Sequence, residues 1–404
     1  MQQDKGALVK IPILDLKGQY RGIQDEIRSA IDEILESQQF ILGPVVEKFE
    51  AEVAAYLRSG AAIGVASGSD ALLLSLMALG IGPGDAVLVP PFTFFASVSC
   101  ITRLGATPIF IDIDPETFLL DPGAVEAFVE GRARPAADGR GLVDPKSQCR
   151  IKALLPVHLF GQCCPMTVLL AQARKHNLAI VEDVAQAFGA REEIAPGPFK
   201  AAGTLGEFGC FSFFPTKNLG GLGDGGMVVT GRSDLAEAVR RLRVHGANHK
   251  YHHLEVGLNS RLDALQAAVL RVKLRYVDQW CEERIERARR YRALFLATGL
   301  VGKQILSLPN PSDGRSHVFN QYVLRASRRD ELRAYLGEQG IMTAVYYPVP
   351  LHLQPCFAFL GYRQGEFPHA ERAADEVLAL PMFPELTQEE QEIVVKRIKA
   401  FYRR

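Results

Sequence analysis

The chain has 404 residues, 48% of them hydrophobic, so it is long enough to bury one large core and a smaller one. Its 46 lysine and arginine residues balance 46 aspartate and glutamate residues, and no basic stripe interleaved with aromatic residues stands out, so nucleic acid is not an expected partner. The amino terminus lacks a signal-peptide core and no apolar stretch reaches the roughly 20 residues of a membrane span, so neither secretion nor a membrane is indicated.

The seven cysteines lack CxxC spacing. An odd number of them in a long neutral chain fits reduced thiols in the cytoplasm better than a disulfide framework. We expect the adjacent pair Cys163 and Cys164 to pack in the interior, and we predict no metal site.

In chain order, Ile23, Ile27, Ile31 and Ile34 first recur at helical spacing and predict an amphipathic helix. From residue 61 to residue 230, short apolar runs such as IGVA, AVLVP, PIFIDI, IKALLPV and AIVEDV alternate with helical patterns. Strands separated by helices predict an α/β fold with a mostly parallel central sheet flanked by helices. Ligands of such sheets bind at the carboxyl ends of the strands.

Residues 131–150 are rich in glycine, proline and charge and lack a hydrophobic period, so we expect an exposed excursion there. Residues 261–296 keep a helical rhythm without proline or glycine, which predicts one long helix that bridges two domains. Strand and helix patterns beyond it indicate a smaller α+β domain. We therefore divide the chain into a large domain, 1–257, and a small carboxy-terminal domain, 258–404.

Lys217 lies where an apolar strand, CFSFF, turns through Pro215 into a glycine cluster. A lysine held against apolar neighbours loses solvation of its ammonium form, so its pKa falls and it can attack aldehydes. A surface lysine in a turn would show the same letters.

The cluster itself matches G-x-G-x-x-G through Gly221, Gly223 and Gly226, the pattern of a dinucleotide site. That pattern needs a helix after it, whereas MVVT is typical of a strand. We therefore expect these glycines to let the backbone pass close to a ligand.

Asp183 ends the apolar run AIVED, at the carboxyl end of a buried strand. A carboxylate there needs a positive partner, such as the protonated ring nitrogen of pyridoxal phosphate, although capping of a following helix explains it equally well. Gln186, three residues on, would lie beside the phenolic oxygen of that ring.

Gly68 and Ser69 stand between the strand IGVA and the helix ALLLSLMAL, where free amides and a hydroxyl suit a phosphate. Ordinary helix capping explains these residues too. Phe94 follows a strand end and could stack on a flat ring, or could belong to the core. None of these features alone identifies a ligand. A planar, phosphorylated, cationic aldehyde would need the lysine, the carboxylate, the phosphate site and the aromatic ring together.

The chain resembles the DegT/DnrJ/EryC/StrS group of sugar aminotransferases, which have the aspartate-aminotransferase fold, or fold type I of the pyridoxal-phosphate-dependent transferases. The resemblance covers nearly the whole chain, in order and at family-like spacing, in SGSDALLLSLMALGIGPGDAVLVPPFTFFAS, GATPIFIDIDPETFLLDP, LPVHLFGQ, VEDVAQAFGA, GCFSFFPTKNLGGLGDGGMVVT, KYHHLEVGLNSRLDALQAAVL and YYPVPLHLQPCFAFLGY.

The resemblance implies pyridoxal 5'-phosphate as cofactor, with Lys217 as its Schiff-base lysine and proton shuttle and Asp183 as partner of the ring nitrogen. It assigns Gln186 to the phenolic oxygen and Phe94 to the ring face. The phosphate would be held by Gly68, Ser69 and Ser212. A branch of the family that has histidine in place of the lysine acts as a dehydratase, and Lys217 argues against that branch.

The resemblance also implies a homodimer with shared active sites, because an asparagine matching Asn259 reaches the phosphate of the neighbouring subunit. Arg261 would point at the substrate of the other chain, and Tyr347 and His352 would line the sugar pocket. Two departures from the family pattern are Ser67-Gly68-Ser69 in place of asparagine-glycine-threonine, and the length of the excursion 131–150.

The expected reaction is a ping-pong transamination from L-glutamate to a nucleotide-linked keto-sugar, a 3-keto-hexose or a 3-keto-uronic acid. Amination at carbon 4 of a 4-keto-6-deoxyhexose remains open. Two hypotheses from other classes are a catalytically silent cofactor-binding regulator and a nicotinamide-dependent sugar oxidoreductase.

Overall fold

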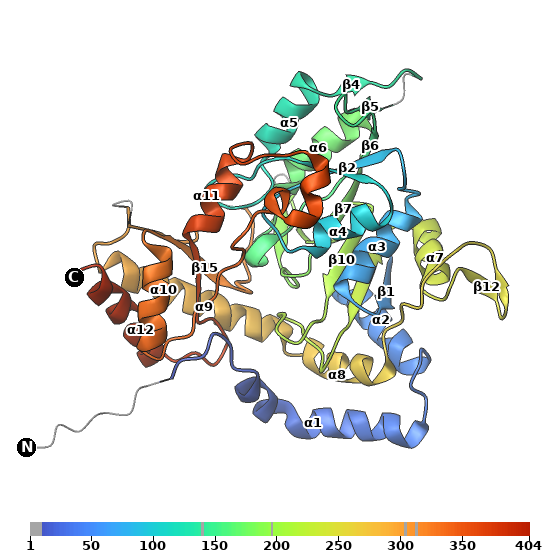
Figure 1. The fold of residues 1–404 in the computed structure, drawn as a ribbon. Coiled ribbons are helices and arrows are strands. Elements are labelled where there is room, and N and C mark those ends of the chain that lie inside the picture. Colours follow the sequence, from blue (N-terminus) through green and yellow to red (C-terminus); the bar gives the residue numbers. More distant parts are fainter. Residues whose placement is uncertain (1–9, 139–140, 195–196, 303–304, 312–313) are drawn as a thin grey trace, which may run out of the picture.

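Seven strands form the centre of the computed structural model, which describes residues 10–138, 141–194, 197–302, 305–311 and 314–404 (Figure 1). They lie in the order β1–β11–β10–β7–β6–β2–β3. Their bounds are β1 Ala61–Val65, β2 Asp85–Val89, β3 Thr107–Phe110, β6 Arg150–Leu154, β7 Ala179–Asp183, β10 Phe208–Ser212 and β11 Gly226–Thr230. The neighbours from β10 to β3 pair in parallel, whereas β11 runs antiparallel to β1 and β10. The predicted α/β fold with a mostly parallel sheet is confirmed.

Both faces of this sheet are covered, as its continuous apolar strands require. On β11, Val228 packs in one hydrophobic cluster with Val239 of helix α7 (Ser233–Leu242), while Met227 and Val229 pack in a second cluster with Phe49 of helix α2 (Pro44–Leu57). This alternation follows from the two-residue period of a strand. The helices that lie against the sheet are α2 Pro44–Leu57, α3 Gly68–Ala78, α4 Ala96–Arg103, α5 Pro122–Gly131, α6 Met166–His176 and α7 Ser233–Leu242.

The amphipathic helix predicted from the isoleucine spacing is α1, Leu16–Ser37, which buries Ile23, Ile27 and Ile34. It lies along α8, Ala264–Leu274, at the bottom of Figure 1. The side chains of α8 pack with α1 and α2. The boundary drawn at residue 257 stays a prediction.

A third hydrophobic cluster belongs to the smaller body at the left of Figure 1. It joins Ile11 to residues of the carboxy-terminal part, and Ile11 forms a bridge with Ile341. The elements here are α9 Val277–Leu296, β14 Leu306–Ser307, β15 Tyr322–Ala326, α10 Arg329–Glu338, β16 Val377–Leu380 and α12 Gln388–Phe401. Between them, η2 Leu351–Leu353, η3 Pro355–Leu360 and α11 Pro368–Glu376 lie against the large sheet's cluster.

The prediction of one long helix over 261–296 is wrong, because α8 ends at Leu274 and α9 begins at Val277. The backbone N–H groups of Arg275 and Tyr276 bond to carbonyls three residues back instead of four. The side chains of both residues donate to Glu26 of α1. The break between α8 and α9 therefore coincides with a contact to α1, and neither a proline nor a glycine marks it in the sequence.

Residues 131–138 and 141–150, the described part of the excursion, are only partly exposed. This part contributes β4, Arg134–Pro135, and β5, Leu142–Val143, and β5 extends the sheet by pairing antiparallel with β6. Asp144 is buried and accepts hydrogen bonds from Arg132 and Ser147. The pairing of β5 with β6 therefore ties the excursion to the sheet, and the Asp144 carboxylate joins two parts of the excursion to each other.

The remaining elements are two hairpins and a short helix: β8 Arg191–Glu193 with β9 Phe199–Ala201, β12 Ala247–His249 with β13 His252–His253, and η1 Leu159–Gly161. In Figure 1 the β12–β13 hairpin projects on the side opposite the smaller body. Among the helices in the described ranges, none combines the length and apolar character that a bilayer crossing requires.

Candidate active site

Asp183 stands at the carboxyl end of β7, with 5% of its surface exposed. Its Oδ2 accepts a hydrogen bond from the Ser97 hydroxyl at 2.7 Å, and its Oδ1 accepts one from the Ala185 N–H at 3.1 Å. Burial raises the pKa of this carboxyl, while the two hydrogen bonds and the nearby Lys217 ammonium act in the opposite direction. Both donors are neutral, and within the described residues the carboxylate forms no ion pair. A buried carboxylate of this kind fits a cationic partner from outside the chain.

Lys217 lies in the turn that follows β10, where its N–H donates to the carbonyl of Phe214 at 2.9 Å. Burial lowers the pKa of its amine to about 8, and the Asp183 carboxylate partly counteracts this effect. The two residues predicted to carry the chemistry thus lie close enough to influence each other's ionisation. An amine with this pKa is a competent nucleophile near neutral pH.

Gly68 and Ser212 lie against each other, as a common phosphate site requires. A Cβ added to Gly68 would come within 2.6 Å of the Ser212 Cβ, so only glycine fits there without a shift. Ser67 caps α3 by accepting the N–H of Asp70 at 3.1 Å, and Ser69 is exposed in the first turn. The helix start with its free amides faces the end of β10, an arrangement suited to an anion.

The glycine cluster after Lys217 leads into strand β11 and not into a helix, which contradicts the dinucleotide pattern. A Cβ at Gly226 would lie 2.3 Å from the carbonyl carbon of Ser67. This glycine therefore allows β11 to pass directly behind the start of α3, as close backbone approach requires.

Gln186 and Tyr347, which the sequence analysis assigned to cofactor and substrate, are joined by a hydrogen bond. The Gln186 Nε2 donates to the Tyr347 hydroxyl at 2.9 Å, and its Oε1 accepts the N–H of Phe160 at 2.8 Å. Phe94 is 54% exposed, and its ring centroid lies 6.1 Å from that of Tyr347. Burial raises the pKa of Tyr347, so its hydroxyl stays protonated. The three side chains form one wall beside the strand ends.

His352, Asn259 and Arg261 are placed differently. His352 is buried, its Nε2 lies 3.1 Å from a carboxylate oxygen of Glu371, and its ring packs edge-on against Phe367. Asn259 is exposed, and Arg261 is half-buried. Within the described ranges, no hydrogen bond links these three side chains to Lys217 or Asp183, so their roles stay predictions.

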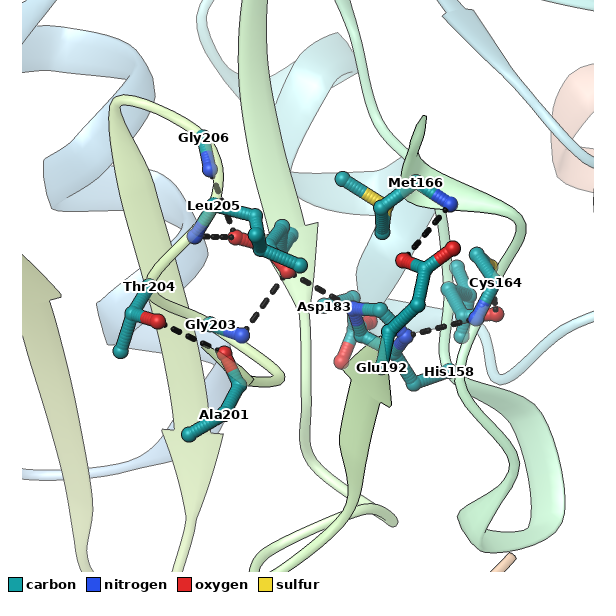
Figure 2. Close-up of polar contacts among 12 residues, drawn as sticks. His158, Cys164, Met166, Asp183, Glu192, Ala201, Gly203, Thr204, Leu205 and Gly206 are labelled. Atoms are coloured by element: carbon teal, nitrogen blue, oxygen red, sulfur yellow. Dashed lines mark hydrogen bonds and ion pairs between the residues drawn. The ribbon is translucent and has the colours of Figure 1, made fainter. Parts of the chain in front are cut away.

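A buried carboxylate that the sequence analysis missed lies next to Asp183. Glu182 is fully buried and accepts three backbone N–H groups at 2.7 to 2.8 Å, those of Gly203, Leu205 and Gly206. Figure 2 labels these three donors and draws their hydrogen bonds as dashed lines. His158 lies 3.0 Å from the same carboxylate, and its other ring nitrogen accepts the N–H of Cys164. The imidazole proton therefore lies on Nε2 and is donated to Glu182. This network anchors β7 and so fixes the position of Asp183.

The structure is similar to the crystal structure of S. venezuelae DesV in complex with a ketimine intermediate, with a TM-score of 0.88 and 41% identity over 98% of this chain and 99% of that chain. The α/β fold and the site with its lysine and buried carboxylate define a pyridoxal-phosphate-dependent aminotransferase of fold type I.

The family model of the DegT/DnrJ/EryC1/StrS aminotransferases matches residues 21–399, and the chain belongs to this family. It is 48% identical to a pleiotropic regulatory protein of Geobacillus stearothermophilus, covering 98% of this chain and 99% of that one. It is 41% identical to the UDP-N-acetyl-3-dehydro-alpha-D-glucosamine 3-aminotransferase of Acidithiobacillus ferrooxidans, covering 98% and 97%. Other relatives are named as transaminases of dTDP-linked 3-amino sugars. The relatives thus include aminotransferases of nucleotide-linked 3-keto sugars.

Proposed function

We propose that this aminotransferase moves the amino group of L-glutamate to carbon 3 of a nucleotide-linked 3-keto-hexose or 3-keto-uronic acid, for amino-sugar biosynthesis. The observation that carries the proposal is the half-buried amine of Lys217, close enough to the buried Asp183 carboxylate for the carboxylate to influence its pKa, in a chain 41% identical to an enzyme named as a sugar 3-aminotransferase. Relatives with UDP and with dTDP in their names share carbon 3 but differ in the nucleotide. The carbon is therefore better supported than the nucleotide.

The described residues fit pyridoxal phosphate. When bound, the cofactor supplies an aldehyde that carries the amino group and a ring that withdraws electrons from the reacting carbon. Asp183 would hold the ring nitrogen protonated, and Gln186 has a second N–H to offer the phenolic oxygen. Gly68, Ser69 and Ser212 would hold the phosphate, and Phe94 would cover the ring face.

Lys217 has two tasks in this proposal. Its neutral amine would hold the cofactor through the aldehyde carbon, with loss of water, and once freed by the amino donor it would move a proton between the donor's α-carbon and the C4′ carbon. An amine with a pKa of about 8 is populated in both protonation states near neutral pH, which both directions of this transfer require.

The sugar would be recognised by Arg261, Tyr347 and His352. The guanidinium group of Arg261 can form an ion pair with either a uronic carboxylate or the diphosphate of the nucleotide. Comparison of Arg261→Gln on a uronic-acid substrate and on a matched hexose separates the two: loss confined to the uronic acid indicates the carboxylate, and equal loss indicates the diphosphate.

We further propose a homodimer in which Asn259 completes the partner's phosphate site. The exposure of Asn259 and of the large apolar side chains Tyr251, Leu254 and Val256 on the same segment supports this. Co-expression of Lys217→Ala and Asn259→Ala subunits tests it. With random pairing, half of the dimers are mixed and each contains one intact site, so about a quarter of the wild-type activity should return. Activity no higher than that of the separate variants would refute shared sites.

The decisive experiment incubates the holoenzyme with L-glutamate and a panel of UDP- and dTDP-linked 3-keto and 4-keto sugars, with identification of the product by mass and NMR. Lys217→Ala is the matched control. We expect amination of 3-keto substrates. Amination confined to 4-keto-6-deoxyhexoses would overturn the assignment of carbon 3.

A regulatory role is the second candidate, because the relative with 48% identity is named a pleiotropic regulatory protein. A catalytically silent regulator would bind the cofactor and become yellow without amino transfer. Absence of aminated product across the whole panel, with the cofactor bound, would favour it.

We place the reaction in the cytoplasm, since all seven cysteines are free thiols.

A further inference from the structure

Two buried hydroxyl groups, those of Ser97 and Thr93, form a hydrogen-bond chain that ends at the Asp183 carboxylate. The Ser97 Oγ lies 2.7 Å from the Asp183 Oδ2, and the Thr93 Oγ1 lies 3.1 Å from the Ser97 Oγ. Ser97 is completely buried and Thr93 is 2% exposed. Because bulk water cannot compete at these positions, both contacts are expected to persist in solution.

The direction of these hydrogen bonds follows from their chemistry. An ionised carboxylate only accepts, and a hydroxyl carries one proton. The Ser97 hydroxyl therefore donates its only proton to Asp183, and the Thr93 hydroxyl donates to the Ser97 oxygen. Since the Ala185 N–H donates to the other oxygen, each oxygen of Asp183 has one donor within the chain. The plane of the carboxylate is fixed, and lone pairs on both oxygens remain for an outside partner.

The same turn also carries Phe94. Thr93 precedes Phe94, and the N–H of Ser97 donates to the Phe94 carbonyl at 3.2 Å as α4 begins. One turn thus presents an exposed aromatic ring and, in the interior, the hydroxyls that hold Asp183. Any shift of this turn would move both groups together.

We propose that Ser97, supported by Thr93, is a positioning residue that keeps Asp183 ionised and aims it at the ring nitrogen of the bound cofactor. The inference rests on the proposed role of Asp183. Without the Ser97 hydroxyl, the buried carboxylate loses one of its two donors and its fixed plane, so it supports the ring charge less well.

The test measures how fast L-glutamate bleaches the visible absorbance of the holoenzyme. Ser97→Ala should lower the limiting rate about ten-fold and leave the half-saturating glutamate concentration within about two-fold, since the hydroxyl acts on the chemical step. Ser97→Thr keeps the hydroxyl and should restore the rate to within about three-fold. Ser75→Ala is the matched control, because Ser75 is equally buried but bonds to Cys210.

A double-mutant cycle shows whether Ser97 acts through Asp183. In an Asp183→Asn background, Ser97→Ala should change the rate by less than about two-fold. An equal loss in both backgrounds would overturn the inference. So would a Ser97→Ala rate equal to that of Ser75→Ala.

The outcomes separate this inference from the function on which it rests. If Asp183→Asn keeps the wild-type rate, the proposed role of Asp183 fails first. If Asp183→Asn is slow and Ser97→Ala is not, only the role of Ser97 fails. Melting temperatures of Ser97→Ala and Ser75→Ala within about 5 °C of each other would exclude simple loss of folding.

Discussion

The amine of Lys217 should react with aldehydes at neutral pH even before the cofactor is bound. Burial lowers its pKa from 10.5 to about 8. At pH 7 an amine with the lower pKa is neutral in about 10% of molecules, against about 0.03% for an ordinary lysine, a gain of about 300-fold. The carboxylate of Asp183 opposes this effect, so Asp183→Asn should lower the pKa of Lys217 further.

The assay mixes cofactor-free protein with pyridoxal phosphate from pH 6 to pH 10 and follows the visible absorbance. Because the neutral amine is the nucleophile, the rate constant should rise about ten-fold per pH unit below pH 8 and then level off. Asp183→Asn should move this inflection to lower pH. Borohydride trapping and peptide mapping then identify the modified lysine.

Lys273 provides an internal comparison. It is buried in α8, its pKa is also lowered to about 8 by burial, and its Nζ donates to the Gly220 carbonyl at 2.7 Å. Lys273→Met should therefore leave the inflection in place. An inflection near 10, trapping on Lys273, or an upward shift in Asp183→Asn would each refute the reasoning.

Three further substitutions test the packing around the site. Gly68→Ala places a Cβ within 2.6 Å of Ser212 and should cost about 1–3 kcal/mol of cofactor binding in equilibrium titration, whereas Gly22→Ala, with open space around it, should have no such effect. Glu182→Gln leaves part of the buried network of three backbone N–H donors without its acceptor. It should lower the free energy of unfolding, measured in urea, by about 3 kcal/mol, and a loss below about 1 kcal/mol would contradict this expectation. Tyr347→Phe removes one hydrogen bond and should cost about 1 kcal/mol in the same assay, and an unchanged urea midpoint would show that the bond contributes nothing.

Much of the fold could be predicted because its strands are buried on both faces. Continuous apolar runs, such as the four residues AVLV that follow Asp85 in β2, mark strands of this kind without any knowledge of their neighbours. The residues at the ends of such strands lie at one edge of the sheet, which is why Asp183 and Lys217 could be predicted as partners although 34 positions separate them. The end of α8 could not be predicted, because the side chains at the break bond to Glu26, some 250 positions earlier.

The groups that orient the site are harder to predict than the groups that react. Ser97 lies 86 positions before Asp183, in a stretch where a small hydroxyl residue is typical of any turn entering a helix. Its proposed role follows only from the hydrogen bond that joins the first turn of α4 to the end of β7. Gln186 and Tyr347, 161 positions apart, were assigned to cofactor and substrate separately, yet one hydrogen bond joins them. In the proposed roles, this bond joins a residue of the cofactor site to a residue of the sugar pocket, so a change at Tyr347 should also alter the donor that Gln186 would offer to the cofactor.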